Sequence, residues 1–531
     1  MIASLANVNY HMINLRQVLL IVSFLSFSIC SHAQDSLNMR VMANLDGLGA
    51  DYNDVWGYSW GDKEYAIVGS NTAINIVDVT DCGNPTLVSA WVDGGSKVWR
   101  DFKDYKDYVY AVCDNCSEGL QIISKANPVD STWQYTDNFT RAHNIYIDES
   151  SGRLYVAGII PNNYGLQVYD LDANPTNPPL LATINFRDWD DGAVASGTNW
   201  YVHDVYVRND TAYCSHGNNG HANWDMSDLS DIQLLGDFDN AGYNHSSWTH
   251  DELPLEYVAR EVPAGMPLEV YDISDMSDIS VIRTFSHSIH PPSGDDPISR
   301  PHNPYYRHDR LYLSNYHDGL KVYDLSDDPE DPQILAYYDT YDINNGNYNG
   351  FEGCWGTYPY LPSGCLLASD ISTGLYTMKL LVPPTRDTEV TDVDVILDTP
   401  AASLYFASTD SKIWRFRMGG AGTILKSIAT SVPSATSEVI NSNLRLTTPG
   451  AGIYMRNNLG EYYKVSIADG GTISSVLVAE ADLPTEHVTF SGQNIYISQY
   501  AAGVEFTSPD GTCYRLSINP GGSNSIVSDC D

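Results

Sequence analysis

Short strand patterns that end in a polar turn recur along the first 380 residues of this chain. The four strongest copies end at Asp78, Asp170, Asp272 and Asp324, and the same position in three weaker copies is Ser124, Asp225 and Met378. Consecutive copies lie 46 to 55 residues apart, as in four-stranded propeller blades. These seven copies predict an all-β fold with a seven-bladed β-propeller. The aspartate is expected to cap its turn by accepting backbone N–H groups.

Each period contains about four strands, as the third one illustrates. Residues 143–147, 153–158, 166–170 and 180–184 alternate apolar with polar positions and end at turn residues. Alternation with β-branched and aromatic residues favours strands. A further strand pattern at residues 37–43 precedes the first full unit. We expect it to form the outer strand of the last blade, because this pairing would close the ring and cover an exposed edge.

The repeat changes near residues 382–386. Three copies of a different strand-turn pattern follow, at residues 413–416, 462–465 and 513–516. We therefore expect the propeller to span residues 34–383 and a smaller all-β module of three repeats to span residues 388–531. A trefoil-like and a sandwich arrangement both fit the module.

The first 33 residues have the pattern of a signal peptide. Arg16 is followed by an apolar run over residues 18–29, and small residues precede a cleavage point after Ala33. We therefore expect export to the extracellular space or the outer cell surface. No later stretch is long and apolar enough to predict a transmembrane helix.

Export permits disulfides, and the cysteine spacing suggests three local pairs. These are Cys113 with Cys116, Cys354 with Cys365, and Cys513 with Cys530; Cys82 and Cys214 are left over. The Cys113–Cys116 spacing also occurs in redox and zinc sites, but no second such motif accompanies it. A structural disulfide is the better interpretation.

The chain is strongly acidic, since acidic residues exceed basic ones by 67 − 28 = 39. This charge repels nucleic acids and anionic membranes and therefore argues against both as partners.

The repeat has a relative among known families. The phrase Leu-x-Val-Tyr-Asp resembles the LVIVD repeat, and the wider pattern resembles the choice-of-anchor B family of secreted bacterial proteins. The matching segments are 99–105, 108–113, 143–147, 315–323, 353–362 and 368–375. The resemblance covers about residues 37–380 and implies a β-propeller on an exported protein with a variable attachment region, without a settled activity. Gln34, after the predicted cleavage point, is similar to export signals of Bacteroidetes.

Aligned first strands place a histidine at one position in four consecutive blades: His143, His203, His245 and His302. Innermost strands line the channel of a propeller, so these imidazoles are candidate ligands for Zn, Cu or Fe. Neighbouring polar residues are candidate outer-shell partners of the imidazoles: Asp54, Asp101, Asn144, Asp204 and Asn303. In the alternative interpretation each histidine bonds a carbonyl of the next blade and seals the channel.

Other chemistry is weakly indicated. Acidic turns at residues 188–191 and 326–331 could hold calcium, but neither has the spacing of an EF-hand. No motif of a nucleotide-binding loop, a nucleophile elbow or a metalloprotease is present. The sequence therefore favours an exported binding or adhesion protein, with an extracellular protein or glycan as partner. The alternatives are a metalloenzyme with a four-histidine site in the channel and a structural surface component.

Overall fold

The protein is described by a computed structural model that covers residues 36–382 apart from 62, 93–98, 161–164, 187–200, 239–241, 290–299 and 342–349. Beyond residue 387 it describes mainly strands, which end at residue 527. The predicted signal peptide and Cys530 lie outside the described residues. Regular structure within them is β apart from isolated turns such as the 3-10 segment η2 (Met276–Asp278).

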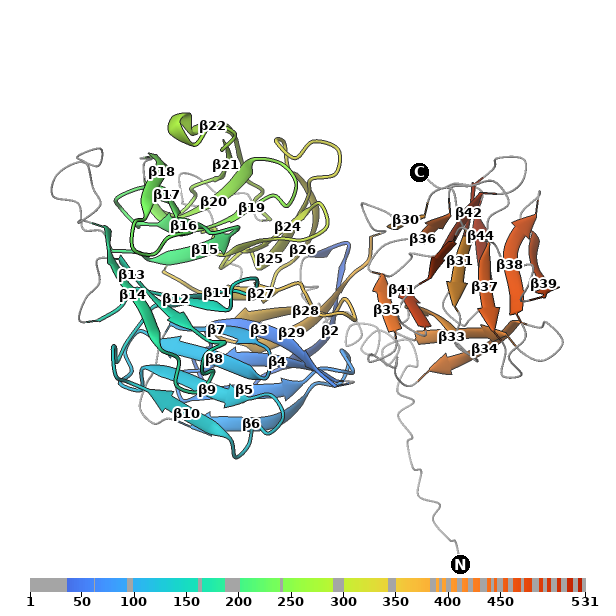
Figure 1. The fold of residues 1–531 in the computed structure, drawn as a ribbon, viewed down its shortest axis with the longest axis horizontal. Coiled ribbons are helices and arrows are strands. Elements are labelled where there is room, and N and C mark those ends of the chain that lie inside the picture. Colours follow the sequence, from blue (N-terminus) through green and yellow to red (C-terminus); the bar gives the residue numbers. More distant parts are fainter. Residues whose placement is uncertain are drawn as a thin grey trace, which may run out of the picture. The chain divides into compact units, whose positions relative to one another are not determined.

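Residues 36–380 form seven antiparallel sheets among the described residues (Figure 1), and we call each sheet a blade. Blades 1 to 3 comprise β3 (Val55–Trp60), β4 (Lys63–Gly69), β5 (Ala73–Asp78) and β6 (Thr86–Val92); β7 (Arg100–Tyr105), β8 (Tyr108–Cys113), β9 (Leu120–Ser124) and β10 (Thr132–Tyr135); and β11 (Asn144–Asp148), β12 (Arg153–Ala157), β13 (Gly165–Asp170) and β14 (Leu180–Asn185). Blades 4 and 5 comprise β15 (Asp204–Arg208), β16 (Thr211–Ser215), β17 (His221–Asp225) and β18 (Gln233–Phe238); and β19 (Tyr243–Thr249), β20 (Leu255–Val262), β21 (Leu268–Asp272) and β22 (Ser280–Phe285). Blades 6 and 7 contain β23 (Pro304–Tyr306), β24 (Arg310–Ser314), β25 (Leu320–Asp324) and β26 (Gln333–Tyr338); and β27 (Cys354–Tyr358), β28 (Leu366–Asp370) and β29 (Gly374–Leu380).

The blades follow one another around a ring. Along the chain, the innermost strands β3, β7, β11, β15, β19 and β23 each contact the next one. The innermost strand of blade 7, β27, contacts β24 of blade 6 and β3 of blade 1, which closes the circle. The predicted β-propeller fold is therefore confirmed.

The ring is closed by strands that precede blade 1 in the chain. β2 (Met39–Leu45) is the outer strand of blade 7 and pairs antiparallel with β29, from Met39 opposite Leu380 to Leu45 opposite Leu375. β1 (Ser36–Leu37) pairs with β26 and extends blade 6. The predicted outer strand is thus confirmed, and it leaves β29 with a partner on both sides.

The recurring aspartate caps its turn as predicted. In five blades one of its carboxylate oxygens accepts a hydrogen bond from the backbone N–H two residues later, over 2.9–3.1 Å. These aspartates are Asp78, Asp170, Asp225, Asp272 and Asp324. Hydrogen bonds from Ser227 and Ser274 lower the pKa of Asp225 and Asp272, respectively. The recurring aspartate therefore stabilises the turn that ends the third strand of each of these blades.

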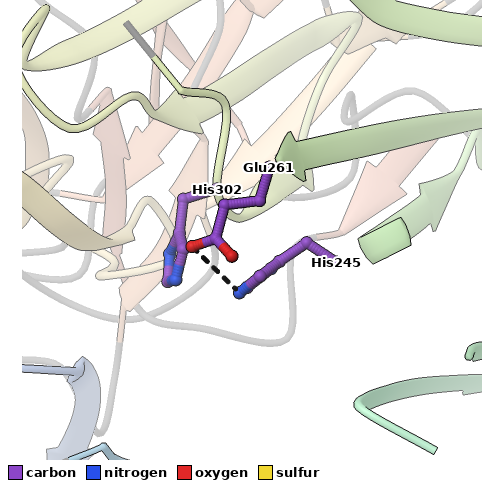
Figure 2. A group of neighbouring side chains, drawn as sticks. All are labelled: His245, Glu261 and His302. Atoms are coloured by element: carbon purple, nitrogen blue, oxygen red, sulfur yellow. Dashed lines mark ion pairs between the residues drawn. The ribbon is translucent and has the colours of Figure 1, made fainter. Parts of the chain in front are cut away.

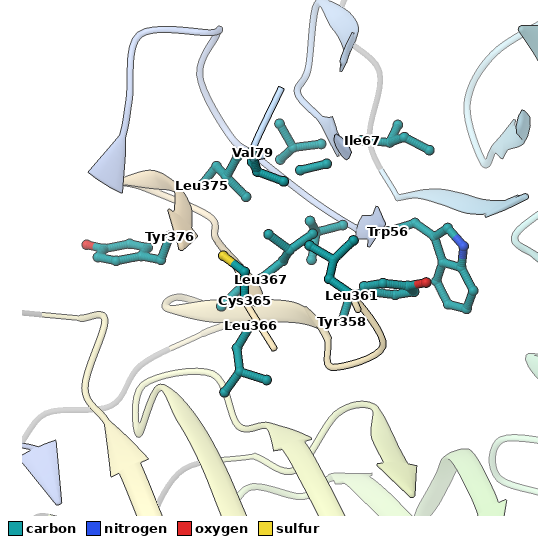
Figure 3. Close-up of a cluster of buried hydrophobic side chains, with 14 of the residues drawn as sticks. Trp56, Ile67, Val79, Tyr358, Leu361, Cys365, Leu366, Leu367, Leu375 and Tyr376 are labelled. Atoms are coloured by element: carbon teal, nitrogen blue, oxygen red, sulfur yellow. The ribbon is translucent and has the colours of Figure 1, made fainter. Parts of the chain in front are cut away.

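The largest apolar cluster lies where the last blade meets the first (Figure 3). Ile67 of β4 and Leu367 of β28 are fully buried there. The indole of Trp56 packs edge-on against Tyr358, with ring centroids 4.7 Å apart. Burial of apolar side chains contributes roughly 1.5–3 kcal/mol each, so this junction is well suited to hold the two ends of the ring together.

One disulfide spans the same junction. Cys82, after β5, is bonded to Cys365, which precedes β28, across 283 residues of sequence. The expected pair Cys354–Cys365 is wrong, and so is the expectation that Cys82 is left over. The register explains this, because Cys354 lies opposite Asp370 at one end of the β27–β28 hairpin and Cys365 lies at the other. Cys354 is buried and free.

The remaining cysteines follow the sequence interpretation where the structure describes them. Cys113 is bonded to Cys116, as predicted. Cys214 is free and buried. The predicted pair Cys513–Cys530 stays a prediction because Cys530 is outside the described residues.

Residues 388–527 contribute three five-stranded sheets, each with strands from all three repeats. The repeats are β30 (Thr388–Val390), β31 (Asp394–Leu397), β32 (Ser403–Ala407), β33 (Ile413–Met418) and β34 (Ile424–Ala429); β35 (Ser437–Ile440), β36 (Leu444–Leu446), β37 (Ile453–Arg456), β38 (Tyr462–Ala468) and β39 (Thr472–Val478); and β40 (His487–Thr489), β41 (Asn494–Ile497), β42 (Val504–Thr507), β43 (Cys513–Ile518) and β44 (Asn524–Val527). One sheet, for example, has the order β30-β36-β42-β43-β44, and its first three strands are parallel.

This interleaving is cyclic. Each repeat gives its first strand to one sheet, its second strand to another, and its last three strands to the third sheet. The predicted all-β repeat module is confirmed. Of the two arrangements expected for it, the threefold one is nearer, since the described strands form three sheets and not the two of a sandwich.

Candidate binding site in the propeller channel

The four predicted histidines form a row at one end of the channel. His143 and His203 directly precede β11 and β15, His245 lies in β19, and His302 precedes β23. Neighbouring ring centroids in this order are 4.2, 4.3 and 4.0 Å apart. Equivalent positions of consecutive blades thus bring the rings together, as the alignment of the repeats implied.

The ring nitrogens in this row do not all face one centre. Nδ1 of His203 lies 3.0 Å from the carbonyl oxygen of His245 in the next blade, which is the sealing contact of the alternative interpretation. Among the described residues, the metal-ligating atoms that gather within 4.8 Å of one another belong to His245, Glu261 and His302. His143 and His203 are not in this group.

The pKa values of the four imidazoles shift in opposite directions along the row. Burial lowers the pKa of His203 and His245 well below the usual value, and it lowers that of His302 to about 3. Burial also acts against protonation of His143, but three carboxylates together raise its pKa: Asp114, whose Oδ2 lies 3.4 Å from Nδ1, and the more distant Asp204 and Asp101. The end of the row at His143 therefore favours a cation, and the other end stays neutral.

The predicted outer-shell residues lie one step deeper and connect blades. Asp54 accepts a hydrogen bond from the backbone N–H of Phe102 (3.3 Å), and Asp101 accepts one from that of Ile145 (2.7 Å). Asn144 accepts one from that of Val205 (3.1 Å). Each of these contacts joins one blade to the backbone of the next. Asn144 also donates from Nδ2 to Asp101 (2.9 Å), so these side chains bond backbone groups and one another, and none of the hydrogen bonds among the described residues joins them to an imidazole.

The last two of these residues also lie in this deeper layer. Asp204 accepts a hydrogen bond from Nδ2 of Asn144 (3.0 Å), and burial raises its pKa to about 7. Asn303 lines the same narrow cavity of about 20 Å³ as Asp101 and Asp204. The Lys103 ammonium, 2.8 Å from Asp101, places a positive charge among these acids.

A larger cavity of about 420 Å³ adjoins the histidine row. Its walls come from all seven blades, from residues that enter an innermost strand or leave a second strand. The polar lining includes Asp51, Asn53, Asp114, His143, His203, His245 and Glu261, and the aromatic lining comprises Tyr52, Trp99, Tyr201, Tyr243, Tyr316, Phe351 and Trp355. We call this cavity the axial pocket.

Most of the axial pocket could not be predicted from the sequence. The histidines were found because they recur at one position, whereas the aromatic residues and carboxylates do not repeat. Asp114 and Glu261 do share a signal, since one follows β8 and the other lies at the end of β20. A search for acidic residues at the ends of second strands would have found both.

Glu261 is the carboxylate nearest to the neutral histidines. It is 8% exposed, and burial raises its pKa. Its Oε1 accepts a hydrogen bond from the Tyr316 hydroxyl (2.6 Å) and lies 3.9 Å from Nε2 of His245. Figure 2 shows the side chains of His245, Glu261 and His302 pointing toward one another.

The acidic turns proposed for calcium give no cluster in the described residues. Residues 188–191 are outside them. In the other turn, Asp328 accepts a hydrogen bond from the backbone N–H of Glu330 (3.0 Å), as in an ordinary capped turn. Within the part of the chain that the structure describes, no helix is long and apolar enough to cross a membrane.

Comparisons with known proteins add little to this geometry. No family model matches the chain, and no curated protein matches it. Among solved structures, it is similar to a functionally unknown protein from Desulfotomaculum acetoxidans DSM 771, with 15% identity over 57% of this chain and 90% of that chain and a TM-score of 0.40. It is also similar to the WD40 β-propeller domain of Doa1 (10% identity, 64% and 96% coverage, TM-score 0.43) and to the computationally designed Ika8 protein (8%, 64% and 99%, 0.41).

The fold and the pocket therefore define a β-propeller with a polar, aromatic-lined pocket on its axis. The resemblance to the choice-of-anchor B family stays a prediction.

Proposed function

We propose that this protein binds a glycan in the axial pocket. The observation that carries the proposal is the lining, in which seven aromatic side chains and three carboxylates surround about 420 Å³. Aromatic rings offer apolar faces with polar edges, which suit the C–H faces of a sugar ring. The carboxylates of Asp51, Asp114 and Glu261 are acceptors for sugar hydroxyls.

The size and position of the pocket suit such a ligand. Binding pockets typically measure about 300–1,000 Å³ and carry a few polar groups that fix orientation. Trp99, which lines the pocket and is 45% exposed, is available to an incoming sugar. Propellers commonly mediate binding, and this pocket lies where all seven blades contribute.

The proposed setting is the extracellular space or the outer cell surface. The signal-like sequence at residues 1–33 supports export. The disulfides Cys82–Cys365 and Cys113–Cys116 fit an oxidising compartment. In this setting the protein acts as a recognition or adhesion module, and residues 388–531 serve attachment or further recognition.

A glycan array followed by calorimetry with the best-bound sugar tests the proposal. Trp99→Ala should weaken binding at least tenfold, because a tryptophan in a pocket is often a dominant contact. Trp133→Ala is the matched control, since Trp133 is also exposed (37%) and belongs to blade 2 but lies in its outer strand β10. Equal effects of the two substitutions, or capture of proteins but no glycan, would contradict the proposal.

The four-histidine metalloenzyme stays the less favoured proposal. Nδ1 of His203 is engaged with a carbonyl oxygen, and the ligand atoms that gather include only His245 and His302 of the four. Its test is the metal content of His143→Ala combined with His203→Ala, which should fall if all four histidines are ligands.

A further inference from the structure

We propose that His245, Glu261 and His302 form a binding site for a divalent first-row transition ion such as Zn²⁺, in the wall of the axial pocket. The three side chains come from three strand ends or loops in blades 5 and 6: His245 from β19, Glu261 from β20 and His302 from the segment before β23. This site goes beyond glycan binding and does not depend on it.

The distances suit a metal ion. One ligand atom from each residue lies within 4.8 Å of the others, and Oε1 of Glu261 is 3.9 Å from Nε2 of His245. Ligands at about 2.0–2.2 Å from zinc are roughly 3.3–3.6 Å apart in a tetrahedron. Small side-chain rotations therefore bring all three atoms to bonding distance.

A cation between these groups would offset the free-energy cost of burying them. His302 is 2% exposed, and the backbone of Trp355 is the one group near its ring that favours the protonated form. Nε2 makes no hydrogen bond of normal geometry among the described residues. A buried polar nitrogen without a partner is costly. Glu261 is also buried, and its carboxylate faces a tyrosine hydroxyl and an imidazole at these distances. The charge of Arg300 lowers the pKa of Glu261, but its guanidinium donates to the backbone oxygen of Glu261 (3.3 Å) and not to the carboxylate. A divalent ion would use both the nitrogen lone pair and the carboxylate charge.

The donor set indicates the kind of ion. Two imidazoles and one carboxylate suit zinc or ferrous iron rather than calcium, which prefers six to eight oxygen ligands. Three protein ligands leave a coordination position open. Tyr316 would be the outer-shell partner, because its hydroxyl donates to Oε1 of Glu261 and such contacts orient a metal-bound carboxylate.

Zinc titration of the untagged full-length chain after EDTA treatment tests the site. The wild type should bind one Zn²⁺ per chain. Glu261→Gln and His302→Gln should each weaken binding at least a hundredfold, and Tyr316→Phe should weaken it about 10–100-fold, as expected for an outer-shell partner. His143→Gln is the matched control, since His143 lies in the same row but outside the proposed set.

Two results would overturn the proposal. One is a wild-type chain without a stoichiometric zinc site. The other is equal loss of zinc in His143→Gln and Glu261→Gln, which would favour the four-histidine row. If the ligand variants fold poorly, Co²⁺ is added to the wild type instead. A site with nitrogen and oxygen ligands and a low coordination number gives visible absorption bands. Absence of these bands would contradict the proposed site.

The two experiments are independent, so a negative result for zinc can be distinguished from a negative result for glycan binding. Zinc is titrated without sugar, and the glycan measurements are repeated in EDTA. Sugar binding that survives EDTA supports the glycan proposal whatever the zinc result, and a zinc site in a chain that binds no sugar supports the metal proposal alone.

Discussion

At the residue scale, burial decides the charge of the channel histidines and their neighbours. The same desolvation acts on His143 and His302, but carboxylates, Asp114 first among them, raise the pKa of His143 alone, so the two pKa values move in opposite directions. The recurring histidine position was predictable from the repeat. The opposite pKa shifts were not, because Asp114 lies outside the aligned strand positions.

Another histidine in blade 4, His216, gives the clearest pH dependence of the free energy of unfolding. His216 is 2% exposed, and burial lowers its pKa to about 3. Its unfolded form takes up a proton near pH 6.5, so between these values the unfolded state binds more protons and stability falls as pH falls. The expected loss from this group is about 2 kcal/mol between pH 7 and pH 5.

Urea unfolding at several pH values checks this expectation. His216→Gln cannot titrate, so its stability should fall with acid less steeply than that of the wild type, by about 1.4 kcal/mol per pH unit. The absolute stability of the variant is a separate matter, since the ring also packs against Phe186. Parallel pH profiles of the two proteins would show that His216 does not titrate in this way.

At the element scale, the two ends of the ring are joined by strand pairing and by a covalent bond. β2 supplies the outer strand of blade 7, and the Cys82–Cys365 disulfide joins blade 1 to blade 7. The strand pairing was predictable because it follows from the repeat and an unpaired strand pattern. The disulfide was not, since cysteines far apart in sequence meet only once the ring exists.

Replacing each disulfide by alanine pairs should separate their contributions. On the chain-entropy account, loss of Cys82–Cys365 costs about 6 kcal/mol and loss of Cys113–Cys116 costs about 2 kcal/mol, because the first closes a much longer loop. Guanidinium unfolding of Cys82→Ala/Cys365→Ala, with Cys113→Ala/Cys116→Ala as control, measures both. Similar losses in the two variants would argue that the long bond acts by local packing.

At the scale of the whole molecule, the main electrostatic feature is the excess of acidic over basic residues. The formal net charge is −39, and such a charge opposes compaction through self-repulsion. Composition alone made this predictable. The axial pocket was not predictable at this scale, because its lining comes from seven blades and non-repeating loop positions such as Trp99 and Phe351.

Raising NaCl from about 0.01 M to about 0.3 M should therefore raise the melting temperature by several degrees, since the Debye length falls from about 30 Å to under 8 Å. Differential scanning calorimetry measures the shift. KCl should act like NaCl if the effect is screening. A melting temperature that does not change, or that rises with one salt only, would mean that self-repulsion is not limiting.

The cyclic exchange of strands among residues 388–527 has a consequence for how this part of the chain arose. Stacked repeats can gain or lose one unit, because each unit contacts only its neighbours. Here the loss of any one repeat would remove strands from all three sheets. The same set of sheets would form if three separate chains, each one repeat long, assembled around a threefold axis. The module is thus the single-chain equivalent of a trimer, and a fusion of three such genes would have preserved every sheet at once.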